Sequence, residues 1–118
     1  MEKYIKAMLI KPGKHPELVV AANELRAFQN LVGGNIEAVG LFDEPATIIC
    51  NEEGLIGGLP INLLINHCPI FGQVVIVGVC GEEFCSLTDD QIDQYLEWWK
   101  AWSIISMDLG EEDGYGMA

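Results

Sequence analysis

Positions 73–80 of the chain read QVVIVGVC, an apolar run without the alternation of polar and apolar residues that marks a half-exposed strand. A continuous apolar strand is typical of a sheet that is covered on both faces. We therefore predict that Gln73–Cys80 is the central strand of the fold. The strands predicted around it form two hairpins and lie at Tyr4–Ile10, Glu17–Val20, Asn35–Phe42 and Ala46–Cys50.

Two helices are predicted from the residues at their ends. Positions 88–91 read TDDQ, which predicts a capping box between Thr88 and Gln91 at the start of a helix. The apolar residues that follow at helical spacing are Ile92, Tyr95, Leu96, Trp99 and Trp102. The other helix is predicted to be capped by Asn23 and to end at Gly33, where a left-handed residue is commonly needed.

These elements predict an α+β fold, with a small, mainly antiparallel sheet of about five strands and two main helices packed against it. The short apolar run Ile61–Ile65 is interpreted as a helical turn that packs on the sheet. The length of 118 residues fits one domain, which is predicted at residues 1–105. Residues 106–118 are predicted to form an acidic, mobile tail.

Charge is distributed unevenly along the chain, which has a net charge of −12. Residues 1–36 hold five bases and three acids, whereas residues 37–118 hold 15 acids and one base, Lys100. This balance argues against direct binding of nucleic acid or anionic membrane, because both need clustered Lys and Arg. It favours head-to-tail association or a basic partner, although the same charge also serves solubility.

The four cysteines predict no metal or redox motif, because Cys50, Cys68, Cys80 and Cys85 contain no CxxC pair. The N-terminus lacks the apolar stretch of a signal peptide, and no run approaches the roughly 20 apolar residues that cross a bilayer. We therefore expect a cytoplasmic protein without a membrane partner. Its thiols are expected to be free and to serve as small buried hydrophobic groups.

Several short motifs together resemble one protein family. They read KPGK (11–14), LVGGNIE (31–37), CNEEG (50–54), GLPIN (58–62), GQVVIVG (72–78) and GEEFCSLTDDQI (81–92). In this order they resemble the family catalogued as domain of unknown function 3846, from Tyr4 to Trp98. The resemblance implies an origin in phages, plasmids or other mobile elements, and hence the cytoplasm of a bacterial host cell. It implies no established activity, catalytic residue or cofactor.

A candidate ligand-binding loop lies at positions 51–62, which read NEEGLIGGLPIN. Its glycines permit close approach of the backbone to a ligand, and its Asn and Glu side chains offer hydrogen bonds. The alternative is an ordinary hairpin turn, for which the same residue types are favoured. The candidate ligand-binding residues are Asn51, Glu52, Glu53, Gly54, Gly58, Pro60 and Asn62.

Catalytic and metal sites are weaker hypotheses. The pairs Glu52-Glu53 and Glu82-Glu83 are of the type that serves as acid and base or holds a cation, but consecutive carboxylates in turns are usually solvated. His67 with Cys50 or Cys68 offers a thiol–imidazole couple, and a zinc site would need Cys68, Cys80 and Cys85 at irregular spacing. We therefore assign no catalytic residue, no metal and no cofactor.

The helix that follows Thr88 offers a candidate interface. Trp98 lies off the apolar stripe, which predicts either a second packing surface, such as a subunit contact, or a partly covered residue at the helix edge. The acids Asp89, Asp90, Asp93 and Glu97 either imitate the phosphates of DNA or form an ordinary solvated helix face. The candidate interface residues are Trp98, Trp102, Asp89, Asp93 and Glu97.

These observations favour a non-enzymatic accessory protein of a phage or mobile element. It would bind a host protein or an element-encoded protein, in a role such as countering host defence. The alternative is an oligomer that binds or sequesters a small, nucleotide-like signal molecule. A hydrolase or a metal-dependent enzyme is the least favoured reading. We expect homo-oligomers, because the chain is small and carries Trp98 off the apolar stripe.

Overall fold

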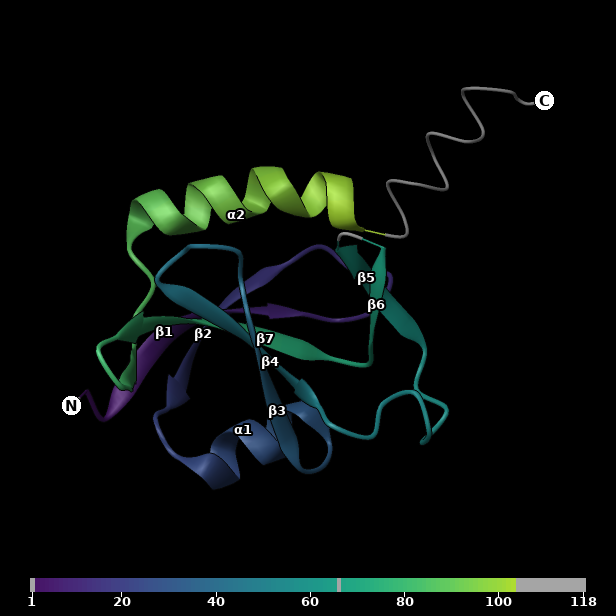
Figure 1. The fold of residues 1–118 in the computed structure, drawn as a ribbon. Coiled ribbons are helices and arrows are strands. Elements are labelled where there is room, and N and C mark those ends of the chain that lie inside the picture. The colour runs from purple at the N-terminus through teal and green to yellow at the C-terminus, as the bar shows by residue number, and fades with distance from the viewer. Residues whose placement is uncertain (1, 66, 104–118) are drawn as a thin grey trace.

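The computed structural model describes residues 2–65 and 67–103, which form an α+β fold as predicted (Figure 1). The elements in chain order are β1 Tyr4–Ile10, β2 Glu17–Ala22, α1 Leu25–Val32, β3 Ile36–Gly40, β4 Ala46–Asn51, β5 Ile61–Ile65, β6 Cys68–Phe71, β7 Val74–Cys80, β8 Glu83–Cys85 and α2 Asp89–Trp102. The predicted tail at residues 106–118 lies outside the described residues. None of the described helices is long and apolar enough to cross a membrane.

The main sheet is antiparallel, with strand order β2-β1-β7-β4-β3. Strand β7 is central: Ile76 pairs with Met8 of β1 on one side and with Ile48 of β4 on the other. The far end of β7 pairs with β8. The prediction of a central strand at Gln73–Cys80 is therefore confirmed, and both predicted hairpins, β1–β2 and β3–β4, are present.

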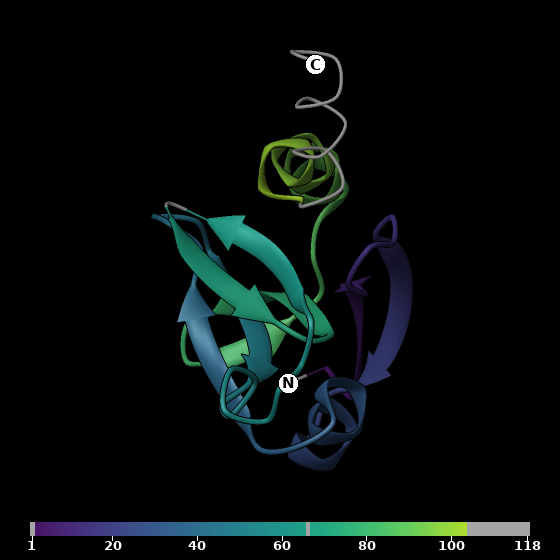
Figure 2. The ribbon, with the colours of Figure 1, turned by 90° about the vertical axis from the view of Figure 1, so that its right-hand side faces the viewer.

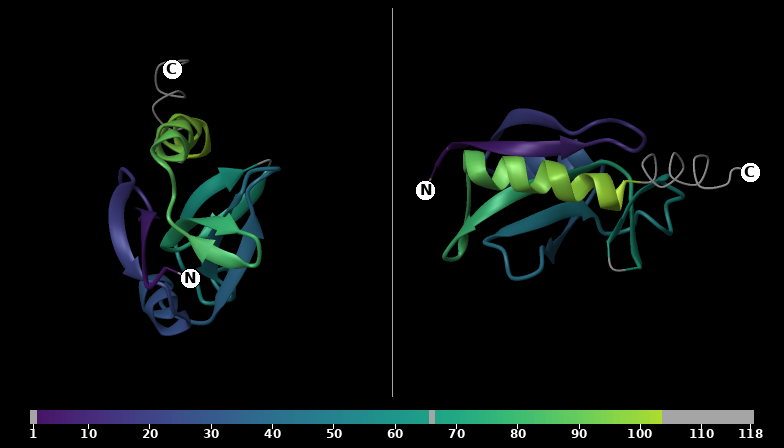
Figure 3. Two further views of the ribbon diagram at one scale, coloured as in Figure 1. Left: turned by 90° about the vertical axis from the view of Figure 1, so that its left-hand side faces the viewer. Right: turned by 90° about the horizontal axis from the view of Figure 1, so that it is seen from above.

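Both faces of the sheet are covered, which explains the unbroken apolar sequence of β7 (Figures 2 and 3). Val74 and Ile76 belong to the core cluster that packs beneath α2. Val75 and Val77 point to the opposite face and belong to the cluster that contains Phe28 of α1. Because side chains alternate along a strand, a strand between two cores must be apolar at every position.

Helix α2 begins as predicted, and α1 does not. The Thr88 side chain accepts from the Gln91 N–H, and the Gln91 side chain accepts from the Thr88 N–H, so the capping box is formed. In α1 the N-cap is Glu24, without a side-chain cap bond. The predicted cap, Asn23, instead donates its amide to the carbonyls of Glu2 and Phe84, at 3.0 Å each. It therefore ties together distant parts of the chain, a role that local sequence does not reveal.

The prediction of a helical turn at Ile61–Ile65 is wrong, because this segment is strand β5. It pairs with β6 in a separate two-stranded sheet, and β6 was not predicted. His67, between the two strands, has a φ of 66°, in the left-handed region. The short run Ile61–Ile65 suits helix and strand equally, and the pairing with β6 decides between them.

The expectation of four free thiols is also wrong. Cys80 and Cys85 form a disulfide across the β7–β8 turn, where their Cα atoms lie 6.0 Å apart. Gly81 in this turn has a φ of 65°, which glycine adopts readily and which allows the tight reversal that brings the two cysteines together. Cys50 is free and buried, as expected, whereas Cys68 is free and exposed.

Candidate binding groove

A groove of about 650 Å³ lies between the β3–β4 hairpin and strand β6. Its volume is within the range of ligand-binding pockets, roughly 300–1,000 Å³. Most of its lining is apolar. The lining side chains from the β3–β4 hairpin and the segment after β3 include Val39, Leu41, Phe42 and Ile48, and those from β6 include Pro69, Ile70 and Phe71.

Among the described residues, the charged groups that line the groove are the carboxylates Glu37 and Glu52. Glu37 lies directly opposite Cys50 in the β3–β4 ladder, and the Cys50 thiol donates to the Glu37 carbonyl at 3.7 Å. Burial, and to a lesser extent the Glu37 charge, raises the pKa of Cys50 to about 11. At neutral pH this cysteine is therefore a thiol rather than a nucleophilic thiolate.

The rim of the groove carries exposed apolar residues. Phe42 is 53% exposed and Leu55 is 70% exposed, and both line the groove. The backbone of Phe42 has a φ of 54°, in a region that bulky residues rarely adopt. Its ring packs against Trp98 of α2, with centroids 5.7 Å apart.

Trp98 itself is half-buried. It packs against the core cluster beneath α2 and also contacts Tyr95 and Trp102. Within the chain Trp98 is therefore partly covered at the helix edge, and its role as a subunit contact stays a prediction. Trp102, another predicted interface residue, is only 7% exposed and belongs to the core cluster.

The predicted ligand loop divides into two parts. Asn51, Glu52 and Gly54 line the groove, and Glu53 is exposed next to them. Asn51 shapes the turn, since its side-chain oxygen accepts from the Glu53 N–H at 2.8 Å and its amide donates to the Val32 carbonyl at 3.3 Å. A side chain at Gly54 would meet Phe71, because an added Cβ would lie 3.1 Å from the Phe71 Cβ. Close packing therefore favours glycine here, since Phe71 would have to shift to admit a side chain.

The other predicted loop residues, Gly58, Pro60 and Asn62, do not line the groove. Asn62 is buried, and its amide donates to the carbonyls of Ile10 and Gly72, at 2.8 Å each. The Pro60 carbonyl accepts from the Gly72 N–H at 2.7 Å. Asn62 thus joins the small sheet to the main sheet, and its two side-chain hydrogen bonds give this residue a structural role.

The acids of α2 lie away from the groove lining, and two of them pair with bases. Asp89 contacts Lys6 at 3.4 Å, and Glu97 contacts Lys100 at 3.1 Å. Asp93 is exposed. Two acids that pair with bases on the same molecule make a weaker imitation of DNA than an unbroken row of carboxylates would.

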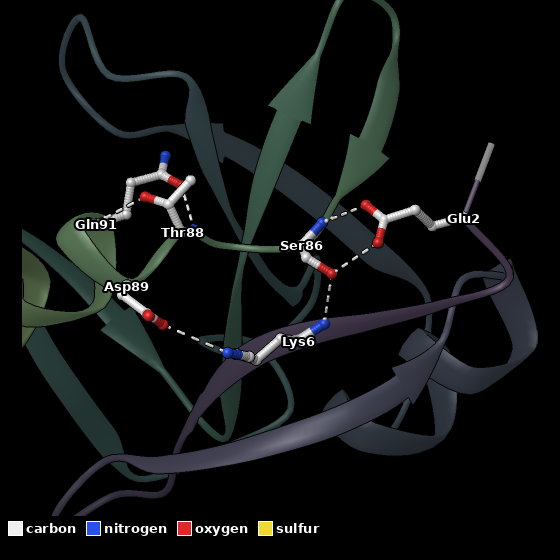
Figure 4. A network of polar contacts seen from close by, with 6 residues as sticks. All are labelled: Glu2, Lys6, Ser86, Thr88, Asp89 and Gln91. Carbon is white, nitrogen blue, oxygen red and sulfur yellow. Dashed lines mark hydrogen bonds and ion pairs between the residues drawn. The ribbon is translucent and has the colours of Figure 1, made fainter.

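A hydrogen-bond network fixes the segment before α2 (Figure 4). The Ser86 N–H and hydroxyl each donate to the Glu2 carboxylate at 2.9 Å, and the same hydroxyl accepts from the Lys6 N–H. These bonds lower the pKa of Glu2. Glu2 and Ser86 therefore have a structural role that joins the start of the chain to the α2 segment.

Sequence reasoning missed the second wall of the groove and its apolar rim. Strand β6 was not predicted, so Pro69, Ile70 and Phe71 were not considered. Phe42 and Leu55 gave a usable signal, since each is a large apolar residue next to turn residues. Across residues 2–65 and 67–103, no group of three or more His, Cys, Asp or Glu is arranged to hold a metal ion.

Comparison with known proteins adds a family and no activity. A search of curated proteins and a search of solved structures both find no match. A family model described as "Domain of unknown function (DUF3846)" matches residues 5–100, which is most of the chain. The similarity seen in the sequence motifs is therefore confirmed, and the chain belongs to the DUF3846 family.

Proposed function

We propose that this chain is a non-enzymatic binding protein whose groove takes an extended segment of a partner protein. The segment carries both apolar and basic side chains. The observation that carries the proposal is the composition of the groove. It is an apolar channel, and the charged groups that line it in the described part of the chain are the carboxylates Glu37 and Glu52.

Charge complementarity favours the basic character of the segment. Asp43 and Glu44 follow β3, and Glu53 follows Glu52, so the acids near the groove outnumber those that line it. Between Arg26 and Lys100 the sequence contains no Lys or Arg. A basic segment would therefore be attracted by the carboxylates of this region, and an acidic one would be repelled.

The exposed apolar residues favour a protein as the partner. Phe42 and Leu55 stand at the rim, and the neighbouring Ile56 is 87% exposed. Large apolar residues that gather beside a groove mark interaction sites more often than chance exposure. Aromatic residues such as Phe42 are enriched in the cores of protein interfaces.

The setting of this proposal comes from the family resemblance. The resemblance implies a phage or mobile element, and a basic host protein involved in defence is a partner of suitable charge. The proposal itself requires only the chemistry of the segment and not its source.

The direct test is a selection from a library of short random peptides displayed on an unrelated carrier. Selected peptides should combine Lys or Arg with large apolar residues, and their binding should weaken as salt rises. The variant E37Q/E52Q should bind them at least about tenfold more weakly, whereas the matched control E82Q, altered in the β7–β8 turn, should bind normally. Selected peptides without basic residues, or equal binding by E37Q/E52Q, would refute the proposal.

A second candidate function is supported by the volume of the groove. About 650 Å³ accommodates a small molecule, and the apolar walls with few polar groups resemble such sites. The carboxylates favour a cationic apolar molecule over the nucleotide-like signal considered above, because phosphates would be repelled. A thermal-shift comparison of hydrophobic amines with nucleotides tests this candidate, and no stabilisation by any amine at large excess would exclude it.

A further inference from the structure

We propose that copies of this chain associate head to tail, with the outer edge of β2 in one copy joining the outer edge of β3 in the next. The two edges lie at opposite ends of the main sheet, and Figure 2 shows β2 and β3 on opposite sides of the molecule. A union of these edges would continue the sheet from one copy to the next.

Strand β3 presents an unprotected edge. The Glu52 N–H donates to the Asn35 carbonyl and the Leu41 N–H donates to the Ala46 carbonyl, so the odd-numbered residues of this segment point toward β4. Because bonding alternates in antiparallel pairs, the backbone groups of Ile36, Ala38 and Gly40 point outward. Among the described strands, none pairs with this outer side.

Strand β2 presents the complementary edge. The Asn23 N–H donates to the Lys3 carbonyl at 2.8 Å, which places the odd-numbered residues of β2 toward β1. The backbone groups of Leu18 and Val20 therefore point outward, and the side chain of Val20 is 73% exposed. Protected edges usually carry Pro, Lys or a bulge, and neither β2 nor β3 contains Lys, Pro or a recorded bulge.

Charge distinguishes this pairing from a symmetric one. The region of β1 and β2, residues 2–22, holds four bases, Lys3, Lys6, Lys11 and Lys14, against the two acids Glu2 and Glu17. The acids around β3 are Glu37, Asp43, Glu44, Glu52 and Glu53. Two β3 edges brought together would place like charges side by side, whereas β2 against β3 brings a region with a net positive charge to an acidic one. Such an asymmetric contact repeats, and it produces rings if the rotation closes and filaments if it does not.

Variants that block one edge each test the proposal in mixtures. Proline at Ala38 or at Val20 removes an outward N–H and leaves the bonds to the neighbouring strand in place. The charge variants A38K and V20E provide the same blocks without proline, in case either proline variant fails to fold. Circular dichroism establishes that each variant is folded before its mass is measured.

The measurement is the molar mass in solution at low salt as protein concentration rises. The unaltered chain should form assemblies of several copies, and A38P and V20P should each remain monomers when alone. An equal mixture of the two should give a complex of two chains and nothing larger, because each contributes its one open edge. High salt should dissociate the assemblies.

Two outcomes would overturn the proposal. One is a monomer of the unaltered chain at every concentration, and the other is assembly that only one of the two edge variants abolishes, which would indicate a symmetric contact. The groove remains testable in either case, because V20P retains the peptide-binding residues. Loss of self-association and loss of peptide binding are thus separate results.

Discussion

Phe42 lies edge-on against Trp98, with the ring centroids 5.7 Å apart and the ring planes at 89°. The contact joins the rim of the groove to helix α2. Phe42 occupies the left-handed backbone region and still exposes half of its side chain to solvent. A strained backbone that presents a half-exposed apolar ring supports the binding role proposed for the groove.

Replacing Phe42 by Asn separates these two roles. Asn tolerates the left-handed conformation, so relief of strain should offset the lost ring contact and leave the unfolding free energy within about 1 kcal/mol. Affinity for the selected peptides should fall by about tenfold or more, as for an interface anchor. Chemical denaturation and peptide titration measure the two effects. A large loss of stability with unchanged affinity would show that Phe42 serves the fold alone.

Asn62 should be far more important for stability than for binding. Its replacement by Ala leaves the buried carbonyls of Ile10 and Gly72 without their donor, which should cost about 2–4 kcal/mol. The exposed Asn35 is the matched control, and N35A should stay within about 0.5 kcal/mol of the unaltered chain. Urea unfolding compares them. Equal stability of N62A and N35A would contradict the role given to Asn62.

Tyr95 should make the protein sensitive to alkaline pH. Burial, followed by the hydroxyl's hydrogen bond to Glu44 at 2.8 Å, raises the pKa of Tyr95 to about 12. In the unfolded chain this hydroxyl ionises near pH 10. The contribution of neutral Tyr95 to the free energy of unfolding is therefore complete below about pH 10 and is lost as the pH rises toward 12. Y95F should lose less stability over this interval in urea unfolding. An equal loss of unfolding free energy in Y95F and the unaltered chain over this pH interval would contradict the role given to Tyr95.

The cysteines should react in three distinct ways. Cys68 is exposed and should be alkylated quickly, whereas Cys50 should react slowly because it is buried and its pKa is about 11. Cys80 and Cys85 should react only after reduction of their disulfide. Mass spectrometry of peptides after timed alkylation, with C68S as the control, measures this order. Fast alkylation of Cys80 without reductant would contradict the disulfide.

The sequence was most informative where a local pattern determines the element. The run at Gln73–Cys80 reports burial on both faces, and the capping box at Thr88 reports a helix start, because both depend on adjacent residues. The prediction of a helical turn at Ile61–Ile65 was wrong for the opposite reason. This segment is a strand because it pairs with β6, which lies beyond a turn at His67. The prediction that Asn23 caps α1 was wrong for the same reason, since its side chain bonds the distant residues Glu2 and Phe84.

The groove was only partly predictable for the same physical reason. The amide and carboxylates at the end of β4 and directly after it drew attention to Asn51, Glu52 and Gly54, which line one side of the groove. The facing wall belongs to β6, and no periodicity in the sequence reports which strands face each other across a gap. Asn62 was misleading, because a buried amide that bonds backbone carbonyls has the same sequence signature as one that bonds a ligand.

The most direct test of the central claim is a titration of the ¹⁵N-labelled V20P variant with a selected basic, apolar peptide, followed by amide NMR. This variant has one blocked sheet edge, so that self-association does not interfere. If the groove binds the peptide, the shifts should be concentrated at Glu37, Val39 and Cys50 on one wall and at Ile70 and Phe71 on the other. Shifts confined to the outer face of α2, around Asp93 and Glu97, would contradict it.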